Sequence, residues 1–350
     1  MLDSPTTPKI TAPNFRVVPG RVAREILDRK GESLIDVVAQ IYLLHAEGGT
    51  VNPDSYFLRF PKNERNRIIA LPAAITNTQP ISGIKWVSSF PDNTQRGIPR
   101  ASAVLILNDA ETGYPVACIE GAQISAMRTA ASATLAWRQL RNPDRGPQRI
   151  GVVGAGIIAR NIMEMFRFDV ALIDEILVHD IDPSSATALA GYVEGALKIR
   201  SRVVTGLAEI FSADTVVLAT TAARPYIADV DLLRPDQVVL NVSLRDLAPE
   251  LILASWNVLD DVEHCLKAQT SPHLAEQLTG GRAFIAGTLA DVMLKRIRPD
   301  RSRSLVFSPF GLGVLDLAFG RTVLEEVVDA GSEMAIPDFF AEVQRWETVR

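Results

Sequence analysis

Cysteine and histidine are scarce in this chain. Its 350 residues include four histidines and only two cysteines, Cys118 and Cys265, which lie far apart in the sequence. So few thiols do not indicate a disulfide framework, and they are typical of a reducing, cytoplasmic compartment. The histidines form no ligand spacing with cysteines or carboxylates, so the sequence predicts no metal site.

Long apolar runs and a basic surplus are also missing. No run approaches the roughly 18 apolar residues of a membrane span. The net charge of −5 is opposite in sign to that of a typical duplex-binding protein, so we expect neither a membrane nor a nucleic acid as partner. Residues 1–19 are polar, carry four prolines and lack the charged start and apolar stretch of a signal peptide, which predicts a loose leader.

The first part of the chain mixes helical and β-rich patterns. Apolar side chains recur at helical spacing over residues 20–48, and the run closes at Gly48 and Gly49, which predicts helical structure there. Short β-rich runs over 55–108 are separated by proline, asparagine and glycine, and they predict an antiparallel sheet or a partial barrel. The alanine-rich residues 120–140 predict another helix.

From Ile150 onward, apolar runs alternate with helical patterns, which is typical of a doubly wound parallel sheet. The predicted strands cover residues 150–153, 175–179, 215–219, 238–242 and 257–259. A final helix over 314–328 is expected to pack on the first part of the chain. The length also fits two domains. We therefore predict an α/β fold with a Rossmann-type sheet (residues 131–314) inserted into an α+β domain (residues 1–130 with 315–350).

A glycine pattern follows the first of these predicted strands and precedes a predicted helix. Gly154 permits a tight turn, and Gly156 lets the backbone approach a pyrophosphate whose charge lies at the helix N-terminus. Ala159 allows close packing of the helix on the strand. In this context the pattern predicts a dinucleotide site, whose turn is formed by Gly154, Ala155, Gly156 and Ile157.

Asp180 ends the next predicted strand and lies 24 residues after Gly156. A carboxylate near this spacing hydrogen-bonds the adenosine 2′-OH and repels a 2′-phosphate, which favours NAD over NADP. The alternative is a solvated turn residue at the strand end. Asp182 is the better candidate for the N-cap of the following helix.

Two further strand ends carry polar residues. Thr220 and Thr221 follow one strand, and Val242 and Ser243 follow another. Because ligands of open parallel sheets lie beyond the carboxyl ends of the strands, we expect these four residues to line the nicotinamide side. For the threonines and the serine, plain capping of the backbone is the alternative.

Five cations accompany the β-rich runs and the alanine-rich helix: Arg59, Arg67, Lys85, Arg100 and Arg128. Lys85 lies between apolar neighbours on a predicted buried strand, so it needs a partner or a ligand. Arg128 lies in a helix that otherwise looks packed, where a guanidinium suits recognition of a carboxylate. A structural ion pair or a surface position is the alternative for each.

Asp246 follows the strand predicted over 238–242. At that edge of the sheet, a carboxylate beside the nicotinamide could activate water as a general base. The alternative is a helix N-cap, with Pro249 in the first turn.

Taken together, these segments resemble the ornithine cyclodeaminase/μ-crystallin family over nearly the whole chain. The long segment 83–133, from GIKWVSSF to MRTAASA, carries this resemblance. A finer similarity is to the family's dehydrogenases that form 2,3-diaminopropionate in siderophore and peptide-antibiotic pathways. The segments that carry it are 55–61, 67–73, 241–250, 260–274, 287–292 and 306–320.

The resemblance implies a role for each matching residue. Lys85 would contact the carboxylate and amine of the substrate, and Arg128 would bind the carboxylate and border the cofactor. Asp246 would activate water, and Asp180 would bind the ribose of NAD. The α+β domain would bind substrate and form a homodimer.

The residues that match the family's substrate side suggest an acidic substrate. Pro309 and Phe310 lie where the family closes over the nicotinamide and the substrate. Arg100 stands where the cyclodeaminases carry a small polar residue, and residues 242–245 lack the family's glycine-rich character; both argue against ornithine. The finer resemblance implies N-(2-amino-2-carboxyethyl)-L-glutamate, whose three carboxylates suit the five cations.

The implied reaction is an oxidative cleavage that yields L-2,3-diaminopropionate, 2-oxoglutarate and NADH. The glutamyl Cα would give hydride to NAD+, and Lys85, with a pKa lowered by burial and neighbouring cations, would take or relay the amine proton. Asp246 would activate water for attack on the C=N carbon. A PLP-dependent synthase joining phosphoserine and glutamate is the expected pathway partner. The alternatives are an ornithine cyclodeaminase, a ketimine reductase and a non-catalytic NAD(P)H-binding, crystallin-like protein.

Overall fold

The computed structural model describes residues 14–77, 79–331 and 334–340. Most of the leader predicted over residues 1–19 lies outside this range. Its last part is not loose, because Phe15–Val18 forms strand β1, which pairs in parallel with a strand of the first sheet. Phe15 and Val18 are buried, so burial of apolar side chains accompanies the backbone pairing.

The first sheet has eight strands in the order β16-β1-β7-β6-β5-β4-β2, with β3 also paired to β4. Besides β1, its strands are β2 (Thr50–Val51), β3 (Tyr56–Arg59), β4 (Arg67–Ile75), β5 (Ile81–Ser89), β6 (Ala101–Asp109), β7 (Pro115–Glu120) and β16 (Ala335–Ile336). From β3 to β7 the pairing is antiparallel, as predicted for residues 55–108. The parallel strand β1 makes the whole sheet mixed.

The helical structure predicted over residues 20–48 is present, but it is not one continuous helix. The structure has two helices there, α1 (Gly20–Lys30) and α2 (Ser33–Ala46). Gly31 separates them with a φ of 55°, a positive value that glycine adopts without steric cost, and it ends α1. The apolar spacing continues across the break because both helices bury one face in the same core.

The second sheet has eight parallel strands in the order β10-β9-β8-β11-β12-β15-β13-β14. They are β8 (Gln148–Val153), β9 (Ile173–His179), β10 (Ser201–Val203), β11 (Thr215–Leu218), β12 (Val238–Asn241), β13 (Trp256–Leu259), β14 (Ile285–Thr288) and β15 (Leu305–Ser308). The predicted doubly wound parallel sheet is confirmed. The strand order reverses between β8 and β11, which is where such sheets bind ligands.

Helices connect these strands and cover the sheets. They are α3 (Gly121–Leu140), α4 (Ile157–Phe166), α5 (Pro183–Tyr192), α6 (Leu207–Phe211), α7 (Pro249–Ala254), α8 (Val262–Cys265), α9 (Ser271–Thr279), α10 (Leu289–Met293) and α11 (Gly313–Asp329). The predicted helices over 120–140 and 314–328 are confirmed, and α11 packs on β4, β5 and β6. Within the described part of the chain, no helix combines the length and apolar character needed to cross a bilayer.

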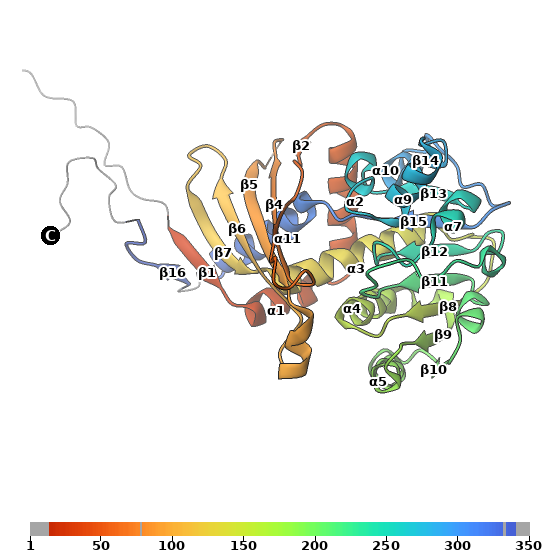
Figure 1. Cartoon of the computed structure of the whole chain (residues 1–350). Helices are drawn as coiled ribbons and strands as arrows, with labels where there is room; N and C mark the ends of the chain where they lie inside the picture. The colour runs from red at the N-terminus through yellow and green to blue at the C-terminus, as the bar shows by residue number, and fades with distance from the viewer. Residues whose placement is uncertain (1–13, 78, 332–333, 341–350) are drawn as a thin grey trace, which may run out of the picture.

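Helix α3 joins the two halves of the molecule. In Figure 1 it runs in yellow from the first sheet to the second, and it packs on α1, α2 and α11 as well as on α4. Trp137, near its C-terminus, is fully buried and donates its indole N–H to Thr215 Oγ1 at 3.1 Å. Side chains in the middle of α3, Arg128 among them, therefore lie between the two sheets.

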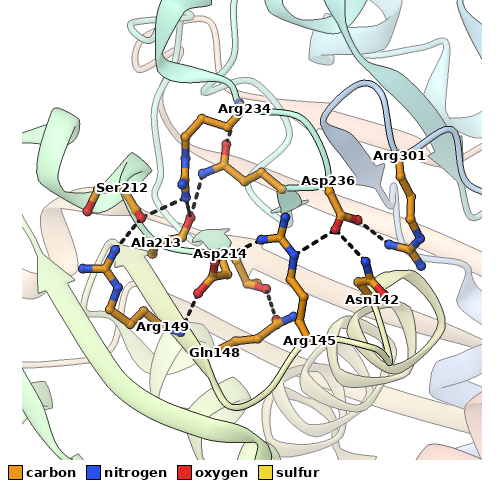
Figure 2. A network of polar contacts seen from close by, with 12 residues as sticks. Asn142, Arg145, Gln148, Arg149, Ser212, Ala213, Asp214, Arg234, Asp236 and Arg301 are labelled. Carbon is orange, nitrogen blue, oxygen red and sulfur yellow. Dashed lines mark hydrogen bonds and ion pairs between the residues drawn. The ribbon is translucent and has the colours of Figure 1, made fainter.

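The amino edge of the second sheet is closed by a polar network (Figure 2). Arg145 pairs with Asp214 and Asp236, and Arg301 pairs with Asp236. Arg234 donates to the Ser212 carbonyl at 2.8 Å. The arginines of this edge bind acceptors of the protein itself, and their contacts connect the loops before the strands. The opposite edge, at the carboxyl ends of the strands, is the one available for a ligand.

Candidate functional site

The glycine-rich turn connects β8 to α4. Gly154 has a φ of 93°, and a Cβ there would lie 2.5 Å from the carbonyl oxygen of Ala219, so this position requires glycine. Gly156 precedes α4, and a Cβ there would meet no atom within 4 Å. The second glycine thus leaves the start of α4 open. Ala155 is half-buried, whereas Ile157 is exposed. The turn has the form that accommodates a phosphate group.

Asp180 lies directly after β9 and beside this turn. Its Oδ2 accepts a hydrogen bond from the Ala155 N–H at 2.6 Å, and its Oδ1 accepts one from the Asp182 N–H at 2.8 Å. Asp182 caps α5 through the N–H groups of Ser184 and Ser185, as predicted. The Asp180 carboxylate is therefore held against the turn. Ile181 next to it is 99% exposed, an unusual position for an isoleucine.

A cavity of about 200 Å³ lies at the carboxyl edge of the second sheet. Its lining includes six predicted site residues: Arg128, Thr220, Val242, Ser243, Pro309 and Phe310. Thr221, which the sequence also placed there, is exposed and does not contribute to the lining. The cavity thus combines loops from three strand ends with helix α3.

Asp246 is fully buried beside this cavity. Its carboxylate accepts hydrogen bonds from Thr220 Oγ1 at 2.7 Å, Ser243 Oγ at 2.5 Å and Tyr226 OH at 3.5 Å. Burial raises the pKa of Asp246, and the three hydroxyl donors oppose this rise. The N-cap alternative is wrong, because Ala248 occupies the cap of α7. A buried carboxyl group with a raised pKa is suited to accept a proton.

Lys85 and Arg128 share one carboxylate, that of Asp316. Lys85 on β5 is 2% exposed, and its Nζ donates to Asp316 Oδ2 at 2.6 Å and to Ser125 Oγ at 3.2 Å. Arg128 donates from Nε to Asp316 Oδ1 at 3.3 Å. Burial and the charge of Arg128 lower the pKa of Lys85 to about 8, although Asp316 opposes the shift.

Asp316 was not predicted from the sequence. It lies in the apolar run of α11 and is fully buried. The signal that could have identified it is a single carboxylate inside the apolar run of residues 313–320, because a buried charge needs a partner. The predicted structural ion pair for Lys85 is therefore present. Arg128, which shares Asp316, lines the cavity, whereas Lys85 and Asp316 are buried behind it and are not among its lining residues.

The loop at Pro309 and Phe310 is fixed by a second buried carboxylate. The N–H groups of Phe310 and Gly311 donate to Asp260 at 2.9 and 2.7 Å. Gly311 has a φ of 93°, and a Cβ there would lie 2.5 Å from Arg128 Nη1. The guanidinium of Arg128 therefore lies directly against this loop.

The predicted arginines of the first sheet lie on the same face as Lys85. In the strand register Arg59 pairs with Arg67 and Arg67 pairs with Ser89, which lies four residues beyond Lys85 on β5. Alternate side chains share a face, so this row lies about 13 Å from Lys85 along the strand. Arg100 reaches it by donating to Ser89 Oγ at 2.6 Å.

Arg245 joins this row from the second half of the molecule. It immediately precedes Asp246 and donates from Nη2 to the carbonyl of Ala268 at 2.8 Å. We name Arg59, Arg67, Arg100 and Arg245 the arginine cluster. Sequence reasoning noted the unusual loop at 242–245 but did not propose Arg245 as a site residue. A cation directly before the candidate base was the available signal.

The arginine cluster has too few anionic partners. None of its four members forms an ion pair with a carboxylate of the described residues, and the Nε atoms of Arg67 and Arg245 are buried without an acceptor. Burial lowers the pKa of Arg67, and the neighbouring charges of Arg245, Arg100 and Arg59 lower it further. The cluster therefore repels itself until an anion binds.

Comparison with known proteins agrees with this geometry. The model of the Ornithine cyclodeaminase/mu-crystallin family matches residues 25–331. The N-((2S)-2-amino-2-carboxyethyl)-L-glutamate dehydrogenase of Staphylococcus aureus is 29% identical over 297 residues, which are 81% of this chain and 87% of that protein. The family match therefore spans the second sheet, the cavity and the first sheet except for strands β1 and β16.

Two solved structures share the fold. The structure of CmnK has a TM-score of 0.83 and 26% identity, and the match covers 93% of this chain and 98% of that one. The Delta(1)-pyrroline-2-carboxylate reductase of Thermococcus litoralis, solved with NADH and L-proline, also has a TM-score of 0.83, with 24% identity and coverage of 92% and 99%. At these identities the likeness supports the arrangement of two sheets rather than a particular substrate.

Proposed function

This chain belongs to the ornithine cyclodeaminase/mu-crystallin family, and we propose that it is an NAD-dependent oxidoreductase that cleaves N-(2-amino-2-carboxyethyl)-L-glutamate into L-2,3-diaminopropionate and 2-oxoglutarate. The arginine cluster is the observation that carries the proposal. Proline, alanine and ornithine each bring one carboxylate, which would leave the cluster without a counter-charge. A substrate with three carboxylates can satisfy Lys85 and Arg128 at one end and the cluster at the other.

The residues around the glycine-rich turn support NAD as the cofactor. The turn suits a pyrophosphate, and Asp180 beside it suits the two ribose hydroxyls of the adenosine and repels a 2′-phosphate. We propose that the exposed Ile181 packs on the adenine, which would bury its apolar side chain. The T. litoralis relative was solved with NADH, in keeping with this assignment.

The cavity residues divide the remaining chemistry. When bound, NAD+ supplies the hydride acceptor. Lys85 and Arg128 bind the carboxylate next to the reacting carbon, and Lys85, with a pKa of about 8, takes the proton of the substrate amine. Thr220, Val242, Ser243 and Pro309 border the cofactor, and Phe310 borders the substrate.

Asp246 acts after the oxidation. Oxidation of the amine leaves a C=N bond. Water attacks the carbon of this bond, and Asp246 takes a proton from that water. Cleavage of the C–N bond then returns a proton to the departing nitrogen, which leaves as the amine of 2,3-diaminopropionate. The overall reaction consumes the substrate, NAD+ and one water, and it releases both products, NADH and one proton.

The first sheet supports a homodimer. Tyr56, Trp86 and Val104 lie in one cross-strand row on the face opposite Lys85, and they are 73%, 41% and 38% exposed. Such an apolar face is typical of a protein interface. We propose that residues 1–130 with 315–350 form the dimerising, substrate-binding domain and residues 131–314 the NAD domain. An archaeal alanine dehydrogenase with this fold was solved as a dimer.

The proposed cellular setting rests on the low cysteine content and on the resemblance to dehydrogenases that form 2,3-diaminopropionate. We propose a cytoplasmic enzyme whose substrate comes from a PLP-dependent synthase that joins phosphoserine and glutamate. Its product, 2,3-diaminopropionate, would then enter siderophore or peptide-antibiotic synthesis.

Absorbance at 340 nm tests the reaction. We expect NADH to form from NAD+ and N-(2-amino-2-carboxyethyl)-L-glutamate, together with 2-oxoglutarate. Proline formed from ornithine would instead indicate a cyclodeaminase, and consumption of NADH with pyrroline-2-carboxylate would indicate a ketimine reductase. Binding of NADH without turnover of any of these compounds would indicate the non-catalytic alternative.

A further inference from the structure

Helix α11 approaches the first sheet closely at the site, because two glycines remove the side chains that would separate them. A Cβ on Gly83 would lie 3.0 Å from Leu317 Cδ2, and a Cβ on Gly320 would lie 2.3 Å from Leu105 Cδ2. Gly83 is two residues before Lys85, and Leu105 pairs with Lys85 across the strands. The glycines thus let α11 bring Asp316 to Lys85.

The contacts of Asp316 leave donors free on both of its partners. Arg128 uses only Nε toward Asp316, so its Nη1 and Nη2 atoms, which make no hydrogen bond within the described chain, can bind a ligand carboxylate in a bidentate manner. Lys85 uses two of its three donors, on Asp316 and Ser125. Both cations therefore keep N–H donors for a ligand, while their contacts with Asp316 hold the two side chains in place.

When Lys85 is protonated, the charges of Lys85, Arg128 and Asp316 add to one net positive charge in a buried place. Lys85, Arg128 and Asp316 are 3%, 11% and 0% exposed at their side chains. The charged groups that face Lys85 are Asp316 from α11 and Arg128 from α3. With Asp316 present, one bound substrate carboxylate brings the net charge of these residues to zero. Without Asp316, the two cations would keep one positive charge after a single carboxylate had bound.

We propose that Asp316 is a positioning residue, which holds Lys85 and Arg128 in a fixed arrangement for one substrate carboxylate and sets the charge that Lys85 experiences. This role rests on the proposed oxidation of a substrate amine at the same site. It adds a third buried group that touches neither substrate nor cofactor and acts through the two cations.

The test compares Asp316→Asn with Ser125→Ala, which removes the other contact of Lys85 without changing a charge. Because the Asp316 carboxylate opposes the lowering of the Lys85 pKa, its loss lowers that pKa further. The acid limb of the kcat/KM profile should therefore move from near pH 8 to lower pH by about one unit or more in Asp316→Asn, and stay in place in Ser125→Ala. The KM should rise about tenfold or more, because Arg128 loses its anchor.

The outcomes separate this inference from the proposed reaction. If the wild-type protein turns over pyrroline-2-carboxylate or ornithine instead, the proposed reaction fails, and the same profiles are measured with that substrate. An Asp316→Asn profile that coincides with the wild-type profile would overturn the role of Asp316.

A second measurement needs no turnover. Unfolding by urea is compared for Asp316→Asn, Lys85→Met and the double variant. We expect Asp316→Asn alone to unfold at a lower urea concentration than the double variant, because it leaves Lys85 buried without its counter-charge. Equal midpoints for these two variants would show that the pair is not coupled and would overturn the proposal.

Discussion

Thr220 donates a hydrogen bond to the buried carboxylate of Asp246 across 2.7 Å. Ser243 does the same across 2.5 Å. Each donor lies two residues beyond the end of its strand, β11 for Thr220 and β12 for Ser243, and the two strands are neighbours in the sheet. The parallel sheet therefore brings both hydroxyls to one carboxylate. Burial disfavours the charged carboxylate and raises its pKa, while the hydroxyls stabilise the charged form, and this balance suits the proposed role of Asp246 as a base.

Replacement of this carboxylate should stop hydrolysis of the oxidised substrate. We expect Asp246→Asn to lower kcat by about a hundredfold or more, because the amide cannot accept a proton from water. Absorbance at 340 nm and detection of 2-oxoglutarate measure the loss. Asp182→Asn, which alters an exposed helix cap, is the matched control and should retain its rate. Near-normal turnover by Asp246→Asn would remove Asp246 from the proposed role.

Neutralising a member of the arginine cluster should weaken substrate binding without destabilising the protein. In the free protein Arg67 is repelled by Arg59, Arg100 and Arg245, so Arg67→Gln removes repulsion and should leave the unfolding midpoint unchanged or raise it. The KM for the tricarboxylate should rise about tenfold to a hundredfold, because a charged hydrogen bond is lost. Initial rates and thermal unfolding provide the two measurements.

Arg65→Gln is the control for this change. Arg65 is exposed and pairs with Asp92, so its replacement should change neither KM nor stability appreciably. An equal effect of both substitutions on KM would mean that general surface charge, rather than the arginine cluster, attracts the substrate.

Removing the charge of Asp180 should weaken the preference for NAD over NADP. Asp180→Asn keeps a side-chain oxygen that can accept from the Ala155 N–H, but it no longer repels a 2′-phosphate. We expect the ratio of the Kd for NADPH to the Kd for NADH to fall by about tenfold. Titration of each nucleotide by its fluorescence measures the ratio. An unchanged ratio would show that Asp180 only supports the turn.

The exposed apolar row of the first sheet gives a prediction about assembly. Trp86→Asp should convert the proposed dimer to a monomer, because the interface would have to bury an unpaired charge. Light scattering after size-exclusion chromatography measures the mass. Ile181→Asp is the control, since Ile181 is even more exposed but lies beside the glycine-rich turn. A monomeric wild-type protein, or a dimeric Trp86→Asp variant, would contradict an interface through this face.

Local sequence patterns predicted the second sheet well, because its features depend on neighbours in the chain. The turn at Gly154 and Gly156, the strand before it and Asp180 after the next strand follow one another within about thirty residues. Strands β10, β14 and β15 were not predicted. They have three or four residues each, but β11, β12 and β13 are equally short and were predicted, so strand length alone does not explain the omission.

Contacts between distant segments were beyond the sequence patterns. Lys85 was predicted to need a partner, but its partner Asp316 is 231 residues away and becomes its neighbour only when α11 packs on β5. Arg67 and Arg245 meet for the same reason, because one lies in the first sheet and the other in a loop of the second. The break at Gly31 was missed because the apolar spacing continues through it.

A network of two histidines and one carboxylate joins the two halves beside the cavity. Asp261 accepts from His264 Nδ1 at 2.9 Å and contacts His45 Nε2 at 2.9 Å. These contacts lower the pKa of Asp261 despite its burial, and Asp261 raises the pKa of His264 above its usual 6.5. His45 belongs to α2 and His264 to α8, so the network connects a helix of the first half of the molecule to a helix of the second half.

The stability that this network contributes should depend on pH in a defined way. The stabilisation that comes from the lowered pKa of Asp261 is present above the usual carboxyl pKa of 3.8. The stabilisation that comes from the raised pKa of His264 is present below 6.5, and it is lost as the pH rises through the higher pKa of the folded protein. Asp261→Asn should therefore cost about 1–3 kcal/mol of unfolding free energy at pH 5.5 and less at pH 9. Urea unfolding at both values measures the difference. Asp54→Asn, which breaks an exposed pair with Lys267, is the control and should cost little at either pH. A cost of Asp261→Asn that is equal at both pH values would mean that His264 is not charged in the folded protein.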